Sequence, residues 1–478
     1  MNNHFPLMIA DTSKPTGSLA VVNPYDQSLL AHVDTCGSEG VESALKAAYS
    51  LFRERDSWLP VSRRIAILDK AVTIMSARAE FLALEASREG GKPLLDSRVE
   101  VIRAIDSIRL CAEQMRSQCG EVIPMGIDKA STAKQAYTII EPIGVVVAIS
   151  AFNHPLNLIA HQVGPAIAAG CPVIIKPAED TPLSCFRLVS ILRESGLPDA
   201  WCQALVTDSV ATSSLLVSDT RVGFLSFIGS AKVGWMLRSR LSPGARCALE
   251  HGGAAPVIVT EKVDLETVLP KLLKGGFYHA GQVCVSVQRV FVHYSLAREL
   301  AEKLAVSARN LRVGDATRED TDVGPMIRPS EVIRVEDWVN QAVESGAELL
   351  CGGKKLSDTT YACTVLYDPP TSAKVSSEEI FGPVICVYPY REIEQAISLA
   401  NSLPWAFQAA VFSNEISTAD YAVSHLDASA VMINEHTAFR VDWMPFAGLR
   451  ESGLGTGGIP YTLRDMQIQK MVVNNLSG

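Results

Sequence analysis

Apolar residues return every three or four positions along much of the first 120 residues, a spacing that places them on one face of a helix. In one stretch Ile65, Leu68, Val72 and Met75 follow this spacing, and two glycines at 90–91 end it. We expect helices at residues 41–53, 61–88 and 94–119, after a polar N-terminal arm with a turn at 23–26.

From residue 143 the pattern changes to short apolar runs that alternate with helical segments. Each run has the length and β-branched composition of a buried strand. Strands are expected at 145–150, 173–175, 203–206 and 222–228, which predicts a parallel, doubly wound sheet.

The same alternation begins again after Gly252–Gly253, which we interpret as the hinge between two lobes. The second lobe should contain strands at 257–259, 290–293, 384–388, 409–412 and 430–433. The predicted fold class is therefore α/β, with two doubly wound domains.

Residues 120–141 are polar and alternate near their end, and the last twenty residues contain another alternating stretch. Two β-arms with unpaired edges are commonly covered by pairing between chains. We expect a homodimer or a homotetramer.

The composition of the 478 residues, 47% hydrophobic and 20% charged, is that of a globular protein of about three domains. A net charge of −9 argues against nucleic-acid or anionic-membrane partners. The eleven cysteines include no CxxC pair, so we expect reduced thiols in the cytoplasm and no metal site. We see no signal peptide, and the longest apolar run, 143–152, is far short of the ~18 residues of a membrane span.

Cys284, in Gly281-Gln282-Val283-Cys284, is the candidate nucleophile, expected just before an apolar strand that starts at Val285. A free cysteine is more often a small buried hydrophobe, so the assignment depends on a base and an oxyanion donor nearby. Glu250 follows Ala248-Leu249 and precedes two glycines, and a partly desolvated carboxylate there could act as a general base.

Ligands of a doubly wound sheet bind beyond the carboxyl ends of its strands. Asn153 lies at such a strand end and is either an oxyanion donor or a turn residue. Lys176 and Glu179 lie at another strand end and form either a ribose-binding site or a surface ion pair. Gly229–Ser230, before a helix, is a pyrophosphate turn or a plain tight turn. The GxGxxG match at 453–458 has no room for a strand-helix-strand unit after it and is interpreted as a loop.

These motifs resemble, in the same order, those of the aldehyde dehydrogenase superfamily, over nearly the whole chain. They are Phe152-Asn153, Lys176-Pro177-Ala178-Glu179, Phe227-Ile228-Gly229-Ser230, Leu249-Glu250-His251-Gly252-Gly253, Gly281-Gln282-Val283-Cys284, Glu379-Ile380-Phe381-Gly382-Pro383, Pro445-Phe446-Ala447-Gly448 and Ser452-Gly453. The resemblance implies a cofactor-binding domain (1–119 and 142–252, with 436–457 returning to it), a catalytic domain (253–435) and an oligomerisation arm (120–141 and 458–478).

The resemblance also implies the role of each residue. Cys284 is the nucleophile, Glu250 the base for water, and Asn153 with the Cys284 N–H the oxyanion hole. NAD would be held by Lys176, Glu179, Gly229, Ser230, Glu379 and Phe381; NADP is possible but disfavoured, because Glu179 would repel a 2′-phosphate. The implied reaction oxidises a small aldehyde to its acid through a thiohemiacetal and a thioester.

Within the superfamily, residues 152–157 and 100–103 are similar to those of phosphonoacetaldehyde, lactaldehyde and non-phosphorylating glyceraldehyde-3-phosphate dehydrogenases. Arg103 and His154 are then expected at an anionic or hydroxylated substrate, although Arg103 could instead pair with Glu100 or Asp106. The sequence departs from the family at His251, where leucine is usual, at Phe152 for tryptophan, and at 207–209, where a glycine-rich turn is common. Val283, just before Cys284, also lies where non-phosphorylating glyceraldehyde-3-phosphate dehydrogenases commonly have arginine.

Two alternatives remain open. A CoA-acylating semialdehyde dehydrogenase tends to lack the glutamate at position 250. A catalytically silent family member with a binding role would not need Cys284, Glu250 and Asn153 together.

Overall fold

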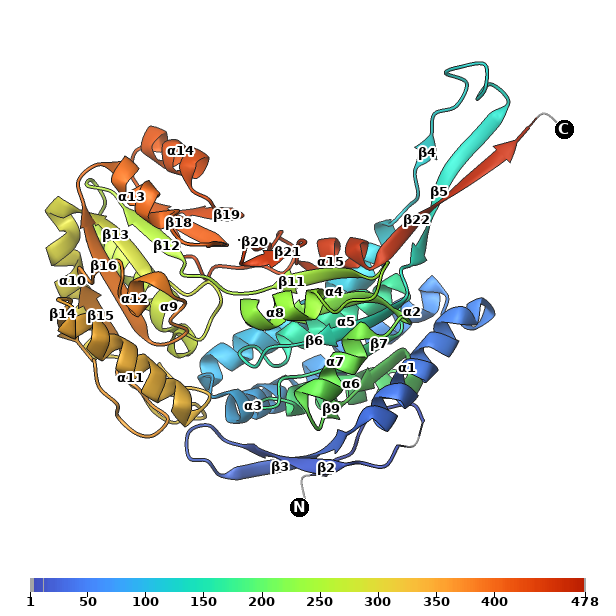
Figure 1. Cartoon of the computed structure of the whole chain (residues 1–478), viewed down its shortest axis with the longest axis horizontal. Coiled ribbons are helices and arrows are strands. Elements are labelled where there is room, and N and C mark those ends of the chain that lie inside the picture. Colours follow the sequence, from blue (N-terminus) through green and yellow to red (C-terminus); the bar gives the residue numbers. More distant parts are fainter. Residues whose placement is uncertain (1–3, 12, 477–478) are drawn as a thin grey trace.

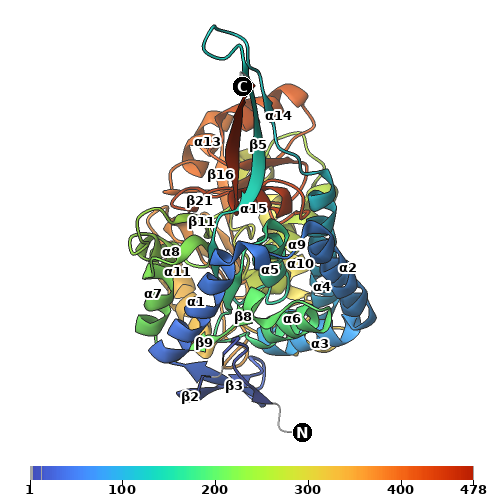
Figure 2. The ribbon, with the colours of Figure 1, turned by 90° about the vertical axis from the view of Figure 1, so that its right-hand side faces the viewer.

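The protein has two α/β lobes side by side and a long β-arm that projects from the first lobe (Figure 1). The structure is a computed structural model, and it describes residues 4–11 and 13–476. Seen from the side, the arm extends well beyond the body of the molecule (Figure 2).

The first lobe is organised around a six-stranded sheet in the order β21-β11-β10-β6-β7-β8. All neighbours are parallel except β21, which runs antiparallel to β11. This confirms the predicted doubly wound sheet, and the strand order reverses direction at β6. The strands are β6 (Val145–Ile149), β7 (Val173–Lys176), β8 (Cys202–Ala204), β10 (Val222–Ile228), β11 (Arg246–Glu250) and β21 (Gly453–Leu454).

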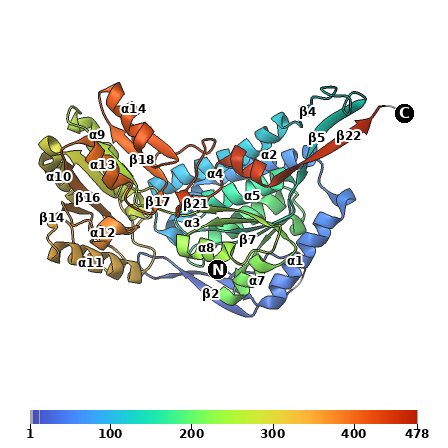
Figure 3. The ribbon, with the colours of Figure 1, turned by 45° about the horizontal axis from the view of Figure 1, so that its top comes forward.

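Helices cover both faces of this sheet (Figure 3). Strand β6 is buried along its whole length, and its residues alternate between two cores: Val146 and Ala148 face one, Val145 and Val147 the other. The first core takes α2 (Val61–Ala77), α3 (Ala79–Gly90), α4 (Leu94–Ser117), α5 (Asn157–Ala169) and α6 (Leu183–Glu194), and the second takes α1 (Ser38–Arg53), α7 (Val210–Ser218) and α8 (Ala231–Arg238).

Two predictions for the N-terminal region were wrong. Residues 61–88 form two helices, because the chain leaves helical geometry at Arg78 (φ −111°, ψ 15°). The expected polar arm contains β-strands, in which Val21 and Val33 are buried against the first core. These strands are β1 (His4–Phe5), β2 (Gly17–Val22) and β3 (Leu29–Cys36), and β9 (Val206–Thr207) extends their sheet.

The second lobe contains a seven-stranded sheet in the order β14-β15-β16-β13-β12-β18-β19, parallel except at β14. All five predicted strands are present, at β12 (Pro256–Val259), β13 (Arg289–His293), β16 (Val384–Tyr390), β18 (Gln408–Phe412) and β19 (Ala430–Ile433). Two further strands are β14 (Glu348–Cys351) and β15 (Thr364–Tyr367). The helices are α9 (Leu265–Phe277), α10 (Tyr294–Arg309), α11 (Pro329–Glu344), α12 (Lys374–Ser377), α13 (Ile393–Ala400) and α14 (Ile416–His425).

The arm is an antiparallel sheet of β4 (Val122–Ile123), β5 (Lys134–Pro142) and β22 (Gln467–Asn475). The C-terminal part of the arm was expected from residue 458, but α15 (Ile459–Asp465) buries Ile459 and Leu463 in the core of the first lobe. Only β22 therefore belongs to the C-terminal part of the arm. Two short strands, β17 (Trp405–Ala406) and β20 (Leu449–Arg450), pair beside the junction of the lobes.

No helix in the described part of the chain is both long and apolar enough to cross a membrane.

Candidate active site

A cavity of about 680 Å³ is lined by residues of both lobes and by the ends of the central strands of the first sheet. It brings together residues that lie up to 343 positions apart in the chain, from Arg103 to Phe446. Every residue predicted for the site lines it: Arg103, Asn153, His154, Lys176, Glu179, Gly229, Ser230, Glu250, Cys284, Glu379 and Phe381.

Cys284 reaches this cavity from a sharply turned segment after α9. His279, Ala280 and Gly281 all have positive φ, and a Cβ on Gly281 would lie 2.1 Å from the Gly382 carbonyl oxygen. Only glycine fits there. The strand expected from Val285 begins four residues later, at Arg289, because Val285 packs with Phe407 and Phe446 instead of entering the sheet.

The thiol of Cys284 is half-buried, and of the eleven cysteines, all of which the structure describes, it alone lines the cavity. All eleven are free thiols. Burial raises the pKa of the Cys284 thiol, the Glu250 carboxylate raises it further, and the Arg440 guanidinium lowers it. Together these effects raise the pKa and favour the neutral thiol, and Arg440 partly offsets them in favour of the thiolate, which is the nucleophilic form.

Asn153 lies directly beside this segment. Its Nδ2 donates a hydrogen bond to the carbonyl oxygen of Gln282 at 2.9 Å. The loop after Asn153 is fixed by the buried carboxylate of Glu100, which accepts hydrogen bonds from the N–H groups of Leu156 and Asn157 and pairs with Lys92 at 2.5 Å. A rigid amide so placed can donate its second N–H to an oxyanion at Cys284.

Glu250 is the last residue of β11, and its side chain is 16% exposed. Burial raises the pKa of this carboxyl above its ordinary value, while Arg440 lowers it. The Nη1 atom of Arg440 lies 3.6 Å from Oε1 of Glu250, beyond hydrogen-bond distance. A desolvated carboxylate with a raised pKa has the properties of a general base.

The carboxyl ends of β7 and β10 supply groups suited to a nucleotide. Lys176 Nζ lies 2.5 Å from Glu179 Oε1, and half of the Glu179 side chain stays exposed to bind hydroxyls. Ser230 is the N-cap residue directly before helix α8, and its side chain makes no capping hydrogen bond. Among the described residues, no backbone carbonyl accepts from the N–H groups of Ser230 or Ala231, so this end of the helix can bind a pyrophosphate.

At the other end of the cavity, Glu379 lies directly on the glycine hinge. It accepts a hydrogen bond from the Gly253 N–H at 3.1 Å, and a Cβ on Gly252 would lie 1.7 Å from its Oε1. Phe381 contacts Phe152 edge to face, with ring centroids 5.8 Å apart. The Glu379 carboxylate therefore fills the space that a side chain at position 252 would need.

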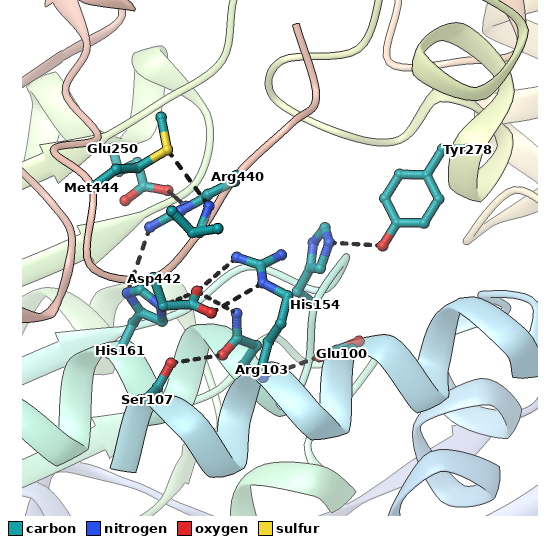
Figure 4. A network of polar contacts seen from close by, with 12 residues as sticks. Glu100, Arg103, Ser107, His154, His161, Glu250, Tyr278, Arg440, Asp442 and Met444 are labelled. Carbon is teal, nitrogen blue, oxygen red and sulfur yellow. Dashed lines mark hydrogen bonds and ion pairs between the residues drawn. The ribbon is translucent and has the colours of Figure 1, made fainter. Parts of the chain in front are cut away.

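Arg103 points inward from α4, whereas Arg98, Arg109 and Arg116 pair with carboxylates at the surface. Its partner is neither Glu100 nor Asp106: Nε and Nη2 form a bidentate pair with Asp442, at 3.1 and 2.7 Å (Figure 4). His154 Nε2 lies 3.2 Å from the Tyr278 hydroxyl. Burial and nearby cations hold the pKa of His154 well below its ordinary value, so the imidazole is neutral.

Arg440 and Asp442 are residues of the site that sequence reasoning missed. Asp442 is buried and accepts from Arg103, from His161 at 2.7 Å and from Asn157 at 3.3 Å. Arg440 stacks on Phe446, with its Cζ 3.6 Å from the ring centroid. The only signal was two charges just before the apolar Pro445-Phe446-Ala447 motif.

The unusual His251 is accommodated without disturbing the site. It is buried between Phe227 and Trp235, and its Nδ1 donates to the Gly229 carbonyl oxygen at 3.0 Å. A side chain at Gly234 would collide with its ring. His251 therefore ties the turn at Gly229 to the strand that carries Glu250.

Comparison with known proteins agrees with this geometry. The model of the aldehyde dehydrogenase family matches residues 10–472. The chain is 35% identical over 458 residues to the 3-sulfolactaldehyde dehydrogenase of Priestia aryabhattai, covering 96% of this chain and 95% of that one.

Two solved structures have the same fold. Aldehyde dehydrogenase 21 of Physcomitrella patens, in complex with the reaction product succinate, superposes with a TM-score of 0.95 at 34% identity, over 100% of this chain and 99% of that one. The glyceraldehyde-3-phosphate dehydrogenase of Methanocaldococcus jannaschii, complexed with NADP, gives 0.91 at 32% identity, over 97% and 100%. The chain therefore belongs to the aldehyde dehydrogenase family, oxidoreductases that act on small aldehydes with a nicotinamide cofactor.

Proposed function

We propose that this protein oxidises a short, negatively charged aldehyde to its carboxylic acid, with NAD preferred as the cofactor. The observation that carries the proposal is the meeting of Cys284, Asn153 and Glu250 with two arginines, Arg103 and Arg440, in one cavity. The first three residues support the reaction. The arginines support the charge of the substrate.

In the proposed reaction the Cys284 thiolate attacks the aldehyde carbon and forms a thiohemiacetal. The negative charge that develops on the aldehyde oxygen is stabilised by the Asn153 amide and the backbone N–H of Cys284. Asn153 already points at this segment through its hydrogen bond to Gln282.

Oxidised nicotinamide held in the cavity would supply the acceptor for the hydride of the former aldehyde carbon, and Cys284 would then carry a thioester. Glu250 then takes a proton from water, and the resulting hydroxide attacks the thioester carbon. The carbon–sulfur bond breaks, the carboxylic acid leaves, and Cys284 is restored as the thiolate.

Lys176, Glu179, Gly229 and Ser230 would hold the adenosine and pyrophosphate parts of the cofactor, and Glu379 and Phe381 its nicotinamide end. Glu179 supports a preference for NAD, because its carboxylate can accept from both ribose hydroxyls and would repel a 2′-phosphate. Lys176 reduces this repulsion, so NADP is disfavoured rather than excluded.

The chemistry of the cavity supports an anionic group on the substrate, apart from its aldehyde group. Arg440 and Arg103 line the same cavity as Cys284 in a protein whose net charge is negative. His154 is neutral and can contact a hydroxyl. Two similar proteins are named for ligands of this kind, a sulfonated lactaldehyde and the dicarboxylate succinate.

The arm supports assembly into a homodimer or homotetramer. Strand β22 forms one edge of its sheet, and Met471 and Val473 are exposed on it. An exposed apolar edge strand is usually covered by another chain.

A screen of short aldehydes that differ in charge tests the proposal. Succinic semialdehyde, 3-sulfolactaldehyde and lactaldehyde would be compared with butyraldehyde, each with NAD and NADP. We expect the highest kcat/KM for a charged aldehyde with NAD. Equal values for charged and uncharged aldehydes would contradict the proposed substrate class.

A further inference from the structure

The guanidinium of Arg440 is unusual because it is almost buried yet makes few hydrogen bonds. Its side chain is 10% exposed. Among the described residues, Nε has no partner, and the nearest acceptor of Nη2 is His161 Nδ1 at 3.5 Å. A guanidinium has five N–H donors, so most of those of Arg440 have no hydrogen-bond partner in the described part of the chain.

The other cations near Cys284 are not available in this way. Arg103 is held by Asp442 in a bidentate pair, and Lys92 is completely buried against Glu100. Stacking on Phe446 fixes the plane of the Arg440 guanidinium within the cavity. Of these three cations, Arg440 therefore has the most N–H donors without a partner among the described residues.

Glu250 already occupies part of this position. The atoms Nη1 and Oε1 are 3.6 Å apart, close enough for strong Coulombic attraction at a buried position but too far for a hydrogen bond (Figure 4). A substrate anion that forms real hydrogen bonds with Arg440 would replace this long contact.

We propose that Glu250 and the anionic end of the substrate compete for Arg440, so that substrate binding releases the carboxylate that later activates water. This inference rests on the proposed function, because it requires an anionic substrate and Glu250 as the base. It adds a coupling between substrate charge and deacylation. With an uncharged aldehyde, Glu250 would stay paired with Arg440, and the acyl group would be hydrolysed slowly from Cys284.

The electrostatics of Glu250 support the coupling. Arg440 lowers the pKa of this carboxyl, so neutralising Arg440 makes Glu250 the stronger base. Coupling between two ligands of one group is reciprocal. A bound anion should weaken the attraction between Arg440 and Glu250 by some factor. Removing the charge of Glu250 should therefore strengthen anion binding at Arg440 by the same factor.

The first test measures binding of methanesulfonate to the cofactor-free protein by ligand-observed nuclear magnetic resonance. Glu250→Gln should bind this anion about 5-fold or more tightly than the unmodified protein. Glu379→Gln is the matched control, a buried carboxylate of the same cavity whose pKa responds to Arg334 rather than Arg440, and it should not change the affinity. Arg440→Gln should lose the binding, and its melting temperature would establish that it is folded.

The second test measures deacylation after an NADH burst with propionaldehyde, which carries no anionic group. Added methanesulfonate should raise the steady rate about 5-fold or more in the unmodified protein and have no effect in Arg440→Gln.

The outcomes separate the two proposals. Suppose that Arg440→Gln loses methanesulfonate binding, that Glu250→Gln binds this anion no more tightly, and that the anion does not accelerate deacylation. The competition for Arg440 is then wrong, and the proposal of an anionic substrate stands. If Arg440→Gln still binds methanesulfonate, Arg440 is not the anion site and the competition is wrong, whereas the proposed substrate class is contradicted only by equal kcat/KM for charged and uncharged aldehydes.

Discussion

The side chain of Asn153 donates a hydrogen bond to the carbonyl oxygen of Gln282, 2.9 Å away and 129 positions further along the chain. The bond joins the end of the first-lobe sheet to the segment that carries Cys284. One amide hydrogen is fixed by this contact, and the other remains for the developing oxyanion.

Replacing Asn153 by alanine should lower kcat about 100- to 1,000-fold, the usual cost of one oxyanion donor. Steady-state kinetics and a titration with NAD would check this. The dissociation constant of NAD should stay the same, because the cofactor contacts proposed here do not include Asn153. A kcat within about threefold of the unmodified protein would show that the amide only holds the loop.

The preference for NAD should depend on the charge of Glu179. Glu179→Gln should raise kcat/KM for NADP about tenfold relative to NAD, because repulsion of the 2′-phosphate is removed. Glu179→Asp keeps the charge and serves as the control, with little change in the ratio. An unchanged ratio in Glu179→Gln would assign the preference to another residue.

Arg103 has two expected roles, and a double variant separates them. Arg103→Leu should lower the free energy of unfolding by about 3 kcal/mol, because the buried Asp442 carboxylate loses its bidentate partner. It should also raise KM for an anionic aldehyde about tenfold or more, with little effect on an uncharged one.

In Arg103→Leu/Asp442→Asn the stability should largely return, because no buried charge is left unpaired, while the defect toward the anionic aldehyde persists. Denaturant unfolding and steady-state kinetics measure the two effects. Recovery of both would show that Arg103 holds Asp442 and does not contact the substrate.

The pH dependence of deacylation should report the carboxyl group of Glu250. Burial raises its pKa above the ordinary 4.5, and a base acts when deprotonated, so the rate should fall as the pH drops through that raised value. Arg440→Gln removes the cation that lowers this pKa, which should move the acidic limb about one pH unit higher or more. An acidic limb at the same pH in both proteins would assign it to another group.

Much of this site follows from the sequence because parallel strands bring their carboxyl ends to one edge. Strand β10 has the predicted bounds, and β6 and β7 differ by one residue, so Asn153, Lys176 and Gly229 had to lie close together. The order of the motifs then placed Cys284 and Glu379 opposite them. Local patterns were sufficient for Asn153, Lys176 and Gly229 because each lies at or just after the end of an apolar strand.

Long-range pairing is what the sequence did not predict. Asp442 lies 339 positions from Arg103, whereas the sequence spacing favoured the helix neighbours Glu100 and Asp106. These two carboxylates pair instead with Lys92 and Arg109. Arg440 belongs to a segment without regular structure, which has no periodicity to read. The break at Arg78 was hidden for a related reason, since the apolar spacing continues across it.

The central claim is that the reaction proceeds through a thioester on Cys284 that Glu250 is needed to hydrolyse. Intact-mass analysis and peptide mapping of Glu250→Gln, quenched after mixing with NAD and an aldehyde, test it most directly. We predict one acyl group per chain, located on Cys284, together with a burst of one NADH and a steady rate about 100- to 10,000-fold below that of the unmodified protein. Cys284→Ala should bind NAD but show neither burst nor adduct. An acyl group on another residue, or steady turnover in Glu250→Gln without an adduct, would contradict the account.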